Sequence, residues 1–354
     1  MKSRVSKLVQ LVILLMVVSC NEPETTVTDI VHTDGSVTRI VEMKSTESDS
    51  LKRFKSSNIQ VPVDASWSIR DSVVFNKKGD TTWLRRAEKL FKNADEINLA
   101  YKSDSGVNRK FSRQANFKKS FRWFNTEYRF SERIERNLSF GYPVDKFLNN
   151  EELKFFYSPD GLRDHLLKSP DSTKYKVLND SVKAKTDSWQ FHSIISEWIG
   201  IFSEMTGGTA GADMTSEVMK SRESAVVSAI EANPQKADSL WTSGVLLQKL
   251  IGETNALKFK VQADTALSMV TRKLTMDFRD YSVKINMPGK LIGTNGFLDS
   301  SRVLLWPVKS DFFFTEPYEM WAESKTTNTW AWIVSGIFVA FVLTGIILRS
   351  IKKG

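Results

Sequence analysis

The sequence predicts an α+β fold: an antiparallel sheet built from the N- and C-terminal parts, a helical middle insertion, and one C-terminal transmembrane helix. Three observations lead to this prediction. Apolar and polar residues alternate, as in strands, before residue 142 and again after residue 275. Between these regions apolar residues recur every three or four positions, as in helices. Residues 329–348 carry no charge and are mostly apolar.

Residues 1–19 have the composition of a signal peptide. An apolar run at 8–18, too short to span a bilayer, follows three basic residues, Lys2, Arg4 and Lys7. The run ends in Val17-Val18-Ser19-Cys20, which resembles the lipobox of bacterial lipoproteins, so we expect cleavage before Cys20 and lipidation of its thiol. Cys20 is the only cysteine, which excludes an intrachain disulfide. The alternative is a plain cleaved signal peptide with an unmodified cysteine.

The apolar run at 329–348 is expected to cross a membrane. At about 1.5 Å per residue a helix of this length spans the roughly 30 Å hydrocarbon layer. Trp330 and Trp332 stand at its start, where indole rings favour the headgroup zone. A buried core helix, the alternative, is disfavoured because the segment is apolar all round. The basic residues that follow it, and that favour a cytoplasmic C-terminus, are Arg349, Lys352 and Lys353.

The two anchors predict one topology. Signal cleavage places Cys20 outside the cytoplasm, and the basic tail places the C-terminus inside it. Because outer-membrane proteins typically span as closed barrels, a helical span favours the inner membrane. We therefore expect a protein that is lipid-anchored and single-pass in the inner membrane, with its main domain in the periplasm. A bridge, with the lipid in the outer membrane and the helix in the inner one, is the alternative.

Local signals divide the part between the anchors. Asp34-Gly35, flanked by alternating apolar residues, is a strong hairpin turn signal. Residues 83–91 fit a strand or a helix, 95–101 a short helix, and 110–133 one or two strands with a bend near Asn125. The expected segments are a signal peptide (1–19), a lipidated N-terminus with hairpin and linker (20–57), a mainly β part (58–142), a helical part (143–274), a second β part (275–325), the transmembrane helix (329–348) and a basic tail (349–354).

The net charge of +9 is mostly explained by the two anchors. The signal peptide and the tail contribute six of the 50 basic residues and no acidic ones, which leaves 44 basic against 41 acidic residues elsewhere, or +3. The high charge is therefore a topology signal rather than a ligand signal. We expect no nucleic-acid partner.

One local excess of positive charge remains, at 109–136, where nine basic residues face only three acidic ones and aromatic residues are interleaved. Such a segment suits an anionic membrane surface, because charge attracts the headgroups and rings enter the interface. The residues expected to contact the anionic surface are Lys118, Lys119 and Arg122. A hairpin with a solvated basic face and an aromatic core face explains the same alternation and is the favoured interpretation.

No pattern in the sequence predicts catalysis, a metal or a cofactor. His32, His165 and His192 are the only histidines, and none has the spacing of a metal-ligand pair. The exported part contains neither Gly-x-Ser-x-Gly nor Ser-x-x-Lys. Glu151-Glu152 is better interpreted as the start of a helix, where negative charge is favourable. We therefore name no catalytic residue.

The C-terminal third resembles a known group of proteins. Met287-Pro288-Gly289-Lys290, Asn295-Gly296, and Val303 with Trp306, followed by one membrane helix and a basic tail, resemble lipoproteins of the mycobacterial LppM type over about the last seventy residues. That resemblance implies an antiparallel sheet packed on a helix, of a kind that can hold lipid. The long helical middle departs from that pattern. As a whole, the chain resembles uncharacterised lipoproteins of the Bacteroidetes.

Two functions follow as expectations. The first is a non-enzymatic, membrane-tethered periplasmic lipoprotein that binds membrane lipid, or a partner such as another envelope protein, at the inner membrane. Double anchoring, the missing catalytic patterns and the basic aromatic segment support it. The alternative is a cell-envelope hydrolase acting on lipid or cell wall through an unrecognised site.

The lipobox interpretation is tested by Cys20→Ser. Because the acyl chain is attached to this thiol, the variant should lose all metabolic labelling by radioactive fatty acid and keep its signal peptide. Immunoprecipitation and gel mobility measure both effects. Labelling that persists in the variant would rule out lipidation at Cys20.

Overall fold

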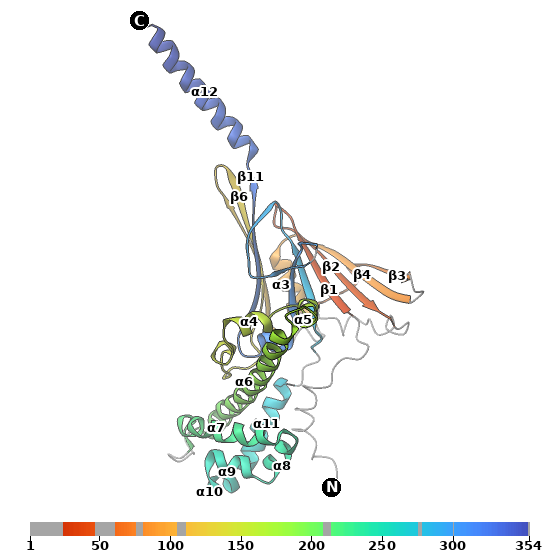
Figure 1. Ribbon diagram of the computed structural model, residues 1–354, viewed down its shortest axis with the longest axis vertical. Coiled ribbons are helices and arrows are strands. Elements are labelled where there is room, and N and C mark those ends of the chain that lie inside the picture. The colour runs from red at the N-terminus through yellow and green to blue at the C-terminus, as the bar shows by residue number, and fades with distance from the viewer. Residues whose placement is uncertain are drawn as a thin grey trace.

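The computed structural model describes residues 24–46, 61–75, 81–104, 111–207, 214–274, 278–299 and 301–352. It has the predicted α+β fold with a helical part and a C-terminal apolar helix, α12 (Thr329–Ile351), but its strands form two sheets. The sheets lie between α12 at one end of the molecule and the helices α6–α11 at the other (Figure 1). Three parts of the sequence predictions lie outside the described residues: the signal peptide with Cys20, residues 109 and 110 of the basic segment 109–136, and Lys353.

The larger sheet, sheet A, joins strands from both ends of the chain. β1 (Glu24–Val31) and β2 (Val37–Ser45) form the predicted hairpin, and Gly35 in its turn has a φ of 94°. β1 pairs in parallel with β7 (Tyr281–Asn286), which connects the N-terminal and C-terminal strands. The strand order is β3 (Ser68–Phe75), β4 (Thr81–Phe91), β2, β1, β7, β10 (Leu304–Val308) and β9 (Phe297–Leu298). Residues 83–91, for which the sequence allowed a strand or a helix, therefore form a strand.

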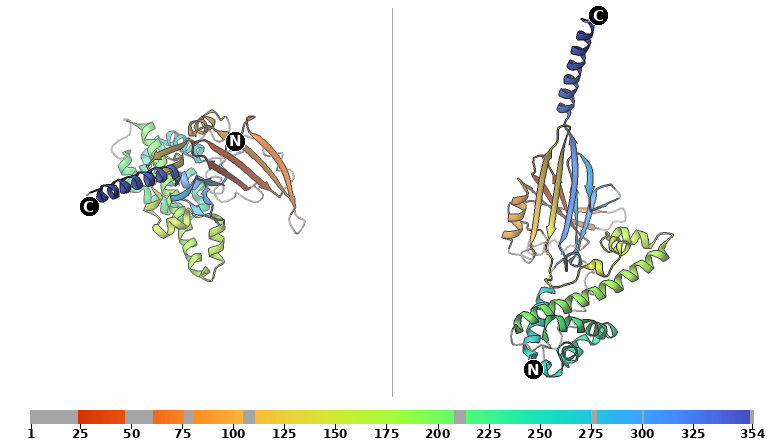
Figure 2. Two further views of the ribbon diagram at one scale, coloured as in Figure 1. Left: turned by 90° about the horizontal axis from the view of Figure 1, so that it is seen from above. Right: turned by 90° about the vertical axis from the view of Figure 1, so that its left-hand side faces the viewer.

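The smaller sheet, sheet B, is antiparallel, and its strands run toward α12 (Figure 2, right). Its order is β5 (Arg113–Phe121), β6 (Asn125–Ile134), β11 (Tyr318–Thr327) and β8 (Lys290–Thr294). β5 and β6 are the two strands expected at 110–133, joined by a tight turn before Asn125. We call Phe121, Arg122, Trp123 and Phe124, where β5 turns into β6, the tip.

The sequence predicted one sheet, and the structure has two because of two turns. Pro288-Gly289 carries the chain from β7 in sheet A to β8 in sheet B, and Asn295-Gly296 carries it back to β9. The Asn295 side chain holds this crossing together. Its Oδ1 accepts from Trp306 Nε1 (2.9 Å) and from the Trp321 backbone (3.0 Å), while its Nδ2 donates to the Glu319 carbonyl (2.7 Å). These turns therefore connect the sheets rather than neighbouring strands.

A buried charge network links the inner faces of the sheets. Arg39 of β2 donates to both carboxylate oxygens of Asp29 on β1, at 2.7 and 2.8 Å, and it also contacts Glu132 of β6. Its third nitrogen donates to Tyr101 Oη at 3.0 Å. Arg113 of β5 contacts Tyr281 of β7 and lies 3.7 Å from Glu132. All of these side chains are buried, so the network fixes how the two sheets face each other.

Burial and charge oppose each other in this network. Burial outweighs the neighbouring Arg39 and raises the pKa of Asp29. At Glu132 burial also disfavours ionisation, but the charges of Arg39 and Arg113 overcome it and hold the pKa below its usual range. Removing one charged partner would therefore leave others buried without compensation.

The helical part comprises the helices from α4 to α11. Its longest helix is α6 (Ser172–Thr206), in which Ile194, Ile195, Trp198, Ile201 and Phe202 are buried. Asn149 begins α4 (Asn150–Phe156) with a capping box to Glu152, which confirms Glu151-Glu152 as a helix start. The other helices are α3 (Ala94–Ser103), α5 (Asp160–Leu167), α7 (Ser216–Ala232), α8 (Ala237–Thr242), α9 (Val245–Ile251), α10 (Glu253–Lys258) and α11 (Lys260–Leu274).

The polar face of α6 is buried because the chain that leaves sheet B packs along it. Glu197 accepts from the backbone N–H groups of Ser139 and Phe140, both at 2.8 Å. Ser196 donates to the Phe140 carbonyl at 2.7 Å, and the Tyr142 N–H donates to Ser193 at 3.2 Å. Side chains of one helix thus satisfy the backbone of an extended segment and attach the helices to sheet B.

The buried network makes a sharp prediction for Arg39→Met. The variant leaves Asp29 and Glu132 without their common partner, so we expect a loss of about 3–5 kcal/mol in the free energy of unfolding. Arg85→Met is the matched control, because Arg85 also binds an aspartate, Asp71, through two nitrogens (both 2.7 Å) but at the surface. It should cost at most about 1 kcal/mol. Urea unfolding of both variants measures the difference, and equal losses would contradict the account.

Candidate membrane interface

The connection between sheet B and α12 is a single residue, Asn328, because β11 ends at Thr327 and α12 begins at Thr329. The Asn328 Nδ2 donates to the carbonyls of Arg122 (2.7 Å) and Trp123 (3.3 Å). Its Oδ1 accepts from Thr126 at 3.0 Å, and its backbone N–H donates to the Phe124 carbonyl at 3.0 Å. Asn328 therefore fastens the start of α12 to the turn between β5 and β6.

Aromatic side chains extend this contact. The ring of Trp330 stacks on Phe121 (centroids 6.4 Å apart) and meets Trp123 edge-on at 5.2 Å. Phe124 packs on Trp332 at 4.4 Å. These rings nevertheless remain substantially exposed to solvent, Phe121 at 59% and Trp123 at 48%. The tip and the first turn of α12 thus form one exposed aromatic cluster.

Among the described residues, α12 is the one helix long and apolar enough to cross a membrane, with a mean hydropathy of 2.5 and only 6% of its apolar window buried. The predicted interface residues Trp330 and Trp332 lie in its first turn. Arg349 and Lys352 lie at its far end. The aromatic and basic flanks therefore bracket the apolar stretch of the helix, as in a single-pass membrane protein.

The outer face of sheet B carries a polar cavity of about 500 Å³ near this cluster. Arg129 lies 2.7 Å from Glu323 and over the ring of Trp321, and Arg122 lies 3.7 Å from Glu127. Lys118 has no ion pair or hydrogen bond with any residue that the structure describes. The lining residues are Asn116, Lys118, Ser120, Arg122, Glu127, Tyr128, Arg129, Ser131, Ile292 and Glu323.

The structure separates the three basic residues that the sequence grouped together. Lys118 and Arg122 line the outer cavity. Lys119 points to the opposite face of the sheet, where it donates to the Thr33 carbonyl at 3.0 Å and lies over the Tyr128 ring. The two-residue alternation of a strand requires this separation. Lys290 was not grouped with these residues in the sequence analysis. It stands opposite Lys325 in the register of β8 and β11, and both side chains are exposed at the end of sheet B nearest α12.

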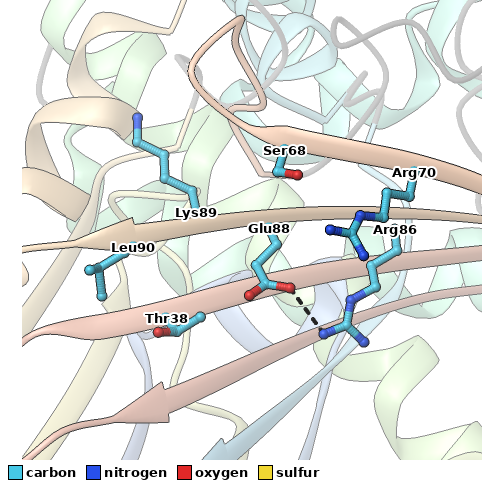
Figure 3. Close-up of a pocket in the computed structure, with 7 residues that line it drawn as sticks. All are labelled: Thr38, Ser68, Arg70, Arg86, Glu88, Lys89 and Leu90. Atoms are coloured by element: carbon cyan, nitrogen blue, oxygen red, sulfur yellow. Dashed lines mark hydrogen bonds and ion pairs between the residues drawn. The ribbon is translucent and has the colours of Figure 1, made fainter.

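A second cavity, of about 280 Å³, lies on the outer face of sheet A (Figure 3). It contains two arginines that face each other across β3 and β4, Arg70 and Arg86. Arg86 is neutralised by Glu88 at 3.1 Å and by Glu42 at 3.4 Å. Thr38, Ser68, Lys89 and Leu90 complete its lining. Its lining has three basic side chains and one acidic one, so charge does not set it apart from the cavity beside α12; it differs in lying on sheet A, which does not continue into α12.

The sequence did not predict one contact between a histidine and a carboxylate. His192 of α6 bonds to buried Glu223 of α7 at 2.6 Å, and Tyr142 donates to the same carboxylate at 2.9 Å. Burial and this carboxylate raise the pKa of Tyr142 to about 12. No local spacing connects residues 192 and 223, because they stand on separate helices. His32 bonds to Thr38 in the β1–β2 hairpin, and His165 lies on α5. Within the described ranges, no three acidic, histidine or cysteine residues gather to hold a metal.

Comparisons with known proteins give little further information. No protein-family model matches the chain, and no curated protein matches it significantly. The NMR structure of the folded domain of LppM from Mycobacterium tuberculosis is similar over 88% of this chain and 95% of that one, with 8% identity and a TM-score of 0.27. At this score LppM is a distant structural neighbour that assigns neither a family nor a ligand.

Asn328→Ala should loosen the junction. The variant removes three side-chain hydrogen bonds, each contributing about 1 kcal/mol, and frees the helix to swing relative to sheet B. In a Cys20→Ser background, nitroxides at Gln114 and Val342 should give a broader distance distribution by pulsed electron paramagnetic resonance in nanodiscs. Asn116→Ala, on the same hairpin but without a junction contact, should leave the distribution narrow. An unchanged, narrow distribution for Asn328→Ala would show that the side-chain hydrogen bonds of Asn328 do not hold the junction.

Proposed function

We propose that this chain is a non-enzymatic, membrane-tethered lipoprotein of the inner membrane whose periplasmic domain binds anionic lipid headgroups beside its own transmembrane helix. The observation that carries the proposal is the position of the outer-face cavity. It lies on the sheet whose strand β11 continues, through Asn328 alone, into α12. Its basic side chains are therefore held near the surface of the membrane that α12 crosses.

Distance decides which basic residues matter most. Arg122 adjoins the first turn of α12, so it lies at headgroup level, and its side chain is 67% exposed. Lys118 lies four residues along the strand, about 13 Å farther from the membrane. Because the attraction falls off within a Debye length of about 8–10 Å, Arg122 contributes close to the full 1 kcal/mol or so expected per basic group and Lys118 less. Lys290 and Lys325 add to the same surface.

The chemistry of the cavity suits binding better than catalysis. Its acidic groups, Glu127 and Glu323, are already in ion pairs. Its hydroxyl and amide groups, on Ser120, Ser131 and Asn116, donate and accept hydrogen bonds without acting as strong acids or bases. Positive charge with neutral donors is the set that recognises a phosphate headgroup.

The His192–Glu223 pair favours the alternative, a cell-envelope hydrolase. A buried carboxylate that orients an imidazole can prepare it to deprotonate water. No nucleophilic serine or cysteine bonds to His192 in the described part of the chain, and the pair also fastens α7 to α6. His192→Gln is the test: loss of a measurable hydrolysis of lipid or peptidoglycan, with unfolding unchanged, would favour the enzyme.

The binding proposal is tested by flotation of a fragment covering residues 24–328 with phosphatidylglycerol liposomes at low salt. The double variant Lys118→Gln with Arg122→Gln should bind roughly ten-fold more weakly, since between 1 and 2 kcal/mol of attraction is lost. Lys119→Gln is the matched control, because it removes the same charge from the opposite face of the same strand, and it should bind nearly as the parent does.

Circular dichroism of each variant confirms that the fragment remains folded. The difference between the parent and the double variant should also vanish with phosphatidylcholine alone or at high salt. If Lys119→Gln weakens binding as much as the double variant, the outer face of sheet B is not the binding surface.

A further inference from the structure

We propose that the tip is a second membrane-inserted element, which enters the lipid interface beside α12. The inference rests on the part of the proposed function that has α12 spanning the membrane, but not on the binding of anionic headgroups. Its partner is the interface of the same bilayer, zwitterionic or anionic.

The depth of the tip follows from one hydrogen bond. Trp123 Nε1 donates to Ser335 Oγ at 2.9 Å. Ser335 lies six residues beyond the start of α12, or about 9 Å along the helix axis. The indole of Trp123 therefore reaches past Trp330 and Trp332, the residues that mark the headgroup zone, along the side of the helix. If α12 crosses the membrane, this ring lies within the interface.

The carbonyl groups of the tip are bonded within the protein, which lowers the cost of leaving water. An unsatisfied peptide group costs several kcal/mol in an apolar medium, so an inserted turn must bond its own N–H and C=O groups. The Arg122 N–H donates to the Asn125 carbonyl at 2.8 Å. The carbonyls of Arg122, Trp123 and Phe124 all accept hydrogen bonds from Asn328. One asparagine thus satisfies three consecutive carbonyl groups that water would otherwise have to reach.

The side chains of the tip suit the same position. Phe121, Trp123 and Phe124 are each 40–59% exposed, although a buried core is available to large apolar groups elsewhere in the domain. Aromatic rings favour the boundary between headgroups and acyl chains. Arg122, placed among them, has a side chain long enough to return its charge to the phosphate level. The turn is therefore apolar and aromatic where it faces lipid and charged where it faces headgroups.

Nitroxide accessibility tests this inference on the full chain. In a Cys20→Ser background, single cysteines replace Phe124 at the tip, Asn116 on the outer face of β5, and Val342 within α12, and each is spin-labelled. The vesicles contain phosphatidylcholine only, in high salt, so that attraction to anionic lipid plays no part. We expect the label at 124 to be more accessible to oxygen than to a water-soluble nickel chelate, as at 342, with the order reversed at 116.

A label at 124 that behaves like the label at 116 overturns the inference, because the tip then lies in water. A second label, at Phe121, checks that replacing Phe124 has not displaced the turn, and it should report the same order. If the label at 342 is itself exposed to the chelate, both α12 insertion and the inference fail. Failure of the anionic liposome experiment alone leaves this result unchanged, so the two proposals are tested separately.

Discussion

Asn328 is the constraint on which the placement of the domain depends. It is the only residue between β11 and α12, and its hydrogen bonds reach across to the β5–β6 turn, so α12 cannot swing freely from the sheet. Sheet B therefore projects from the start of α12 along the line of that helix. Sheet A follows through the charge network around Arg39, and the helices follow through α6, which places them farthest from α12 (Figure 1).

Directional hydrogen bonds from polar side chains join the two sheets, the helical part and α12. Three polar side chains bond to segments distant in sequence: Arg39 between the sheets, Glu197 between α6 and residues 139–140, and Asn328 at the start of α12. Burying such groups adds little net stability, because desolvation offsets much of the attraction. Their directional bonds instead make wrong arrangements costly, since a misplaced segment leaves a buried charge or carbonyl unpaired. Apolar packing supplies the bulk of the stability and these contacts supply the geometry.

Local patterns in the sequence predicted the local structure well. The β1–β2 hairpin, α3, the β5–β6 strands, the helical middle and α12 all follow from periodicity and turn signals. The parallel pairing of β1 with β7 and the division into two sheets did not, because strand pairing over some 250 residues leaves no local signal. The contact between His192 and Glu223 was not predicted for the same reason, since Glu223 stands on another helix. The opposite orientation of Lys118 and Lys119 was available from alternation alone.

If α12 crosses a membrane, we expect the domain to stand end-on from it, with the sheets near the bilayer and the helices away from it. Neutron reflectometry of the full chain in a supported, deuterated bilayer measures this directly. The account predicts protein density extending well beyond the roughly 34 Å length of the ten-residue strand β11. Protein density confined to a thinner layer against the headgroups would contradict it, because the domain would then lie flat and the Asn328 junction would not direct it.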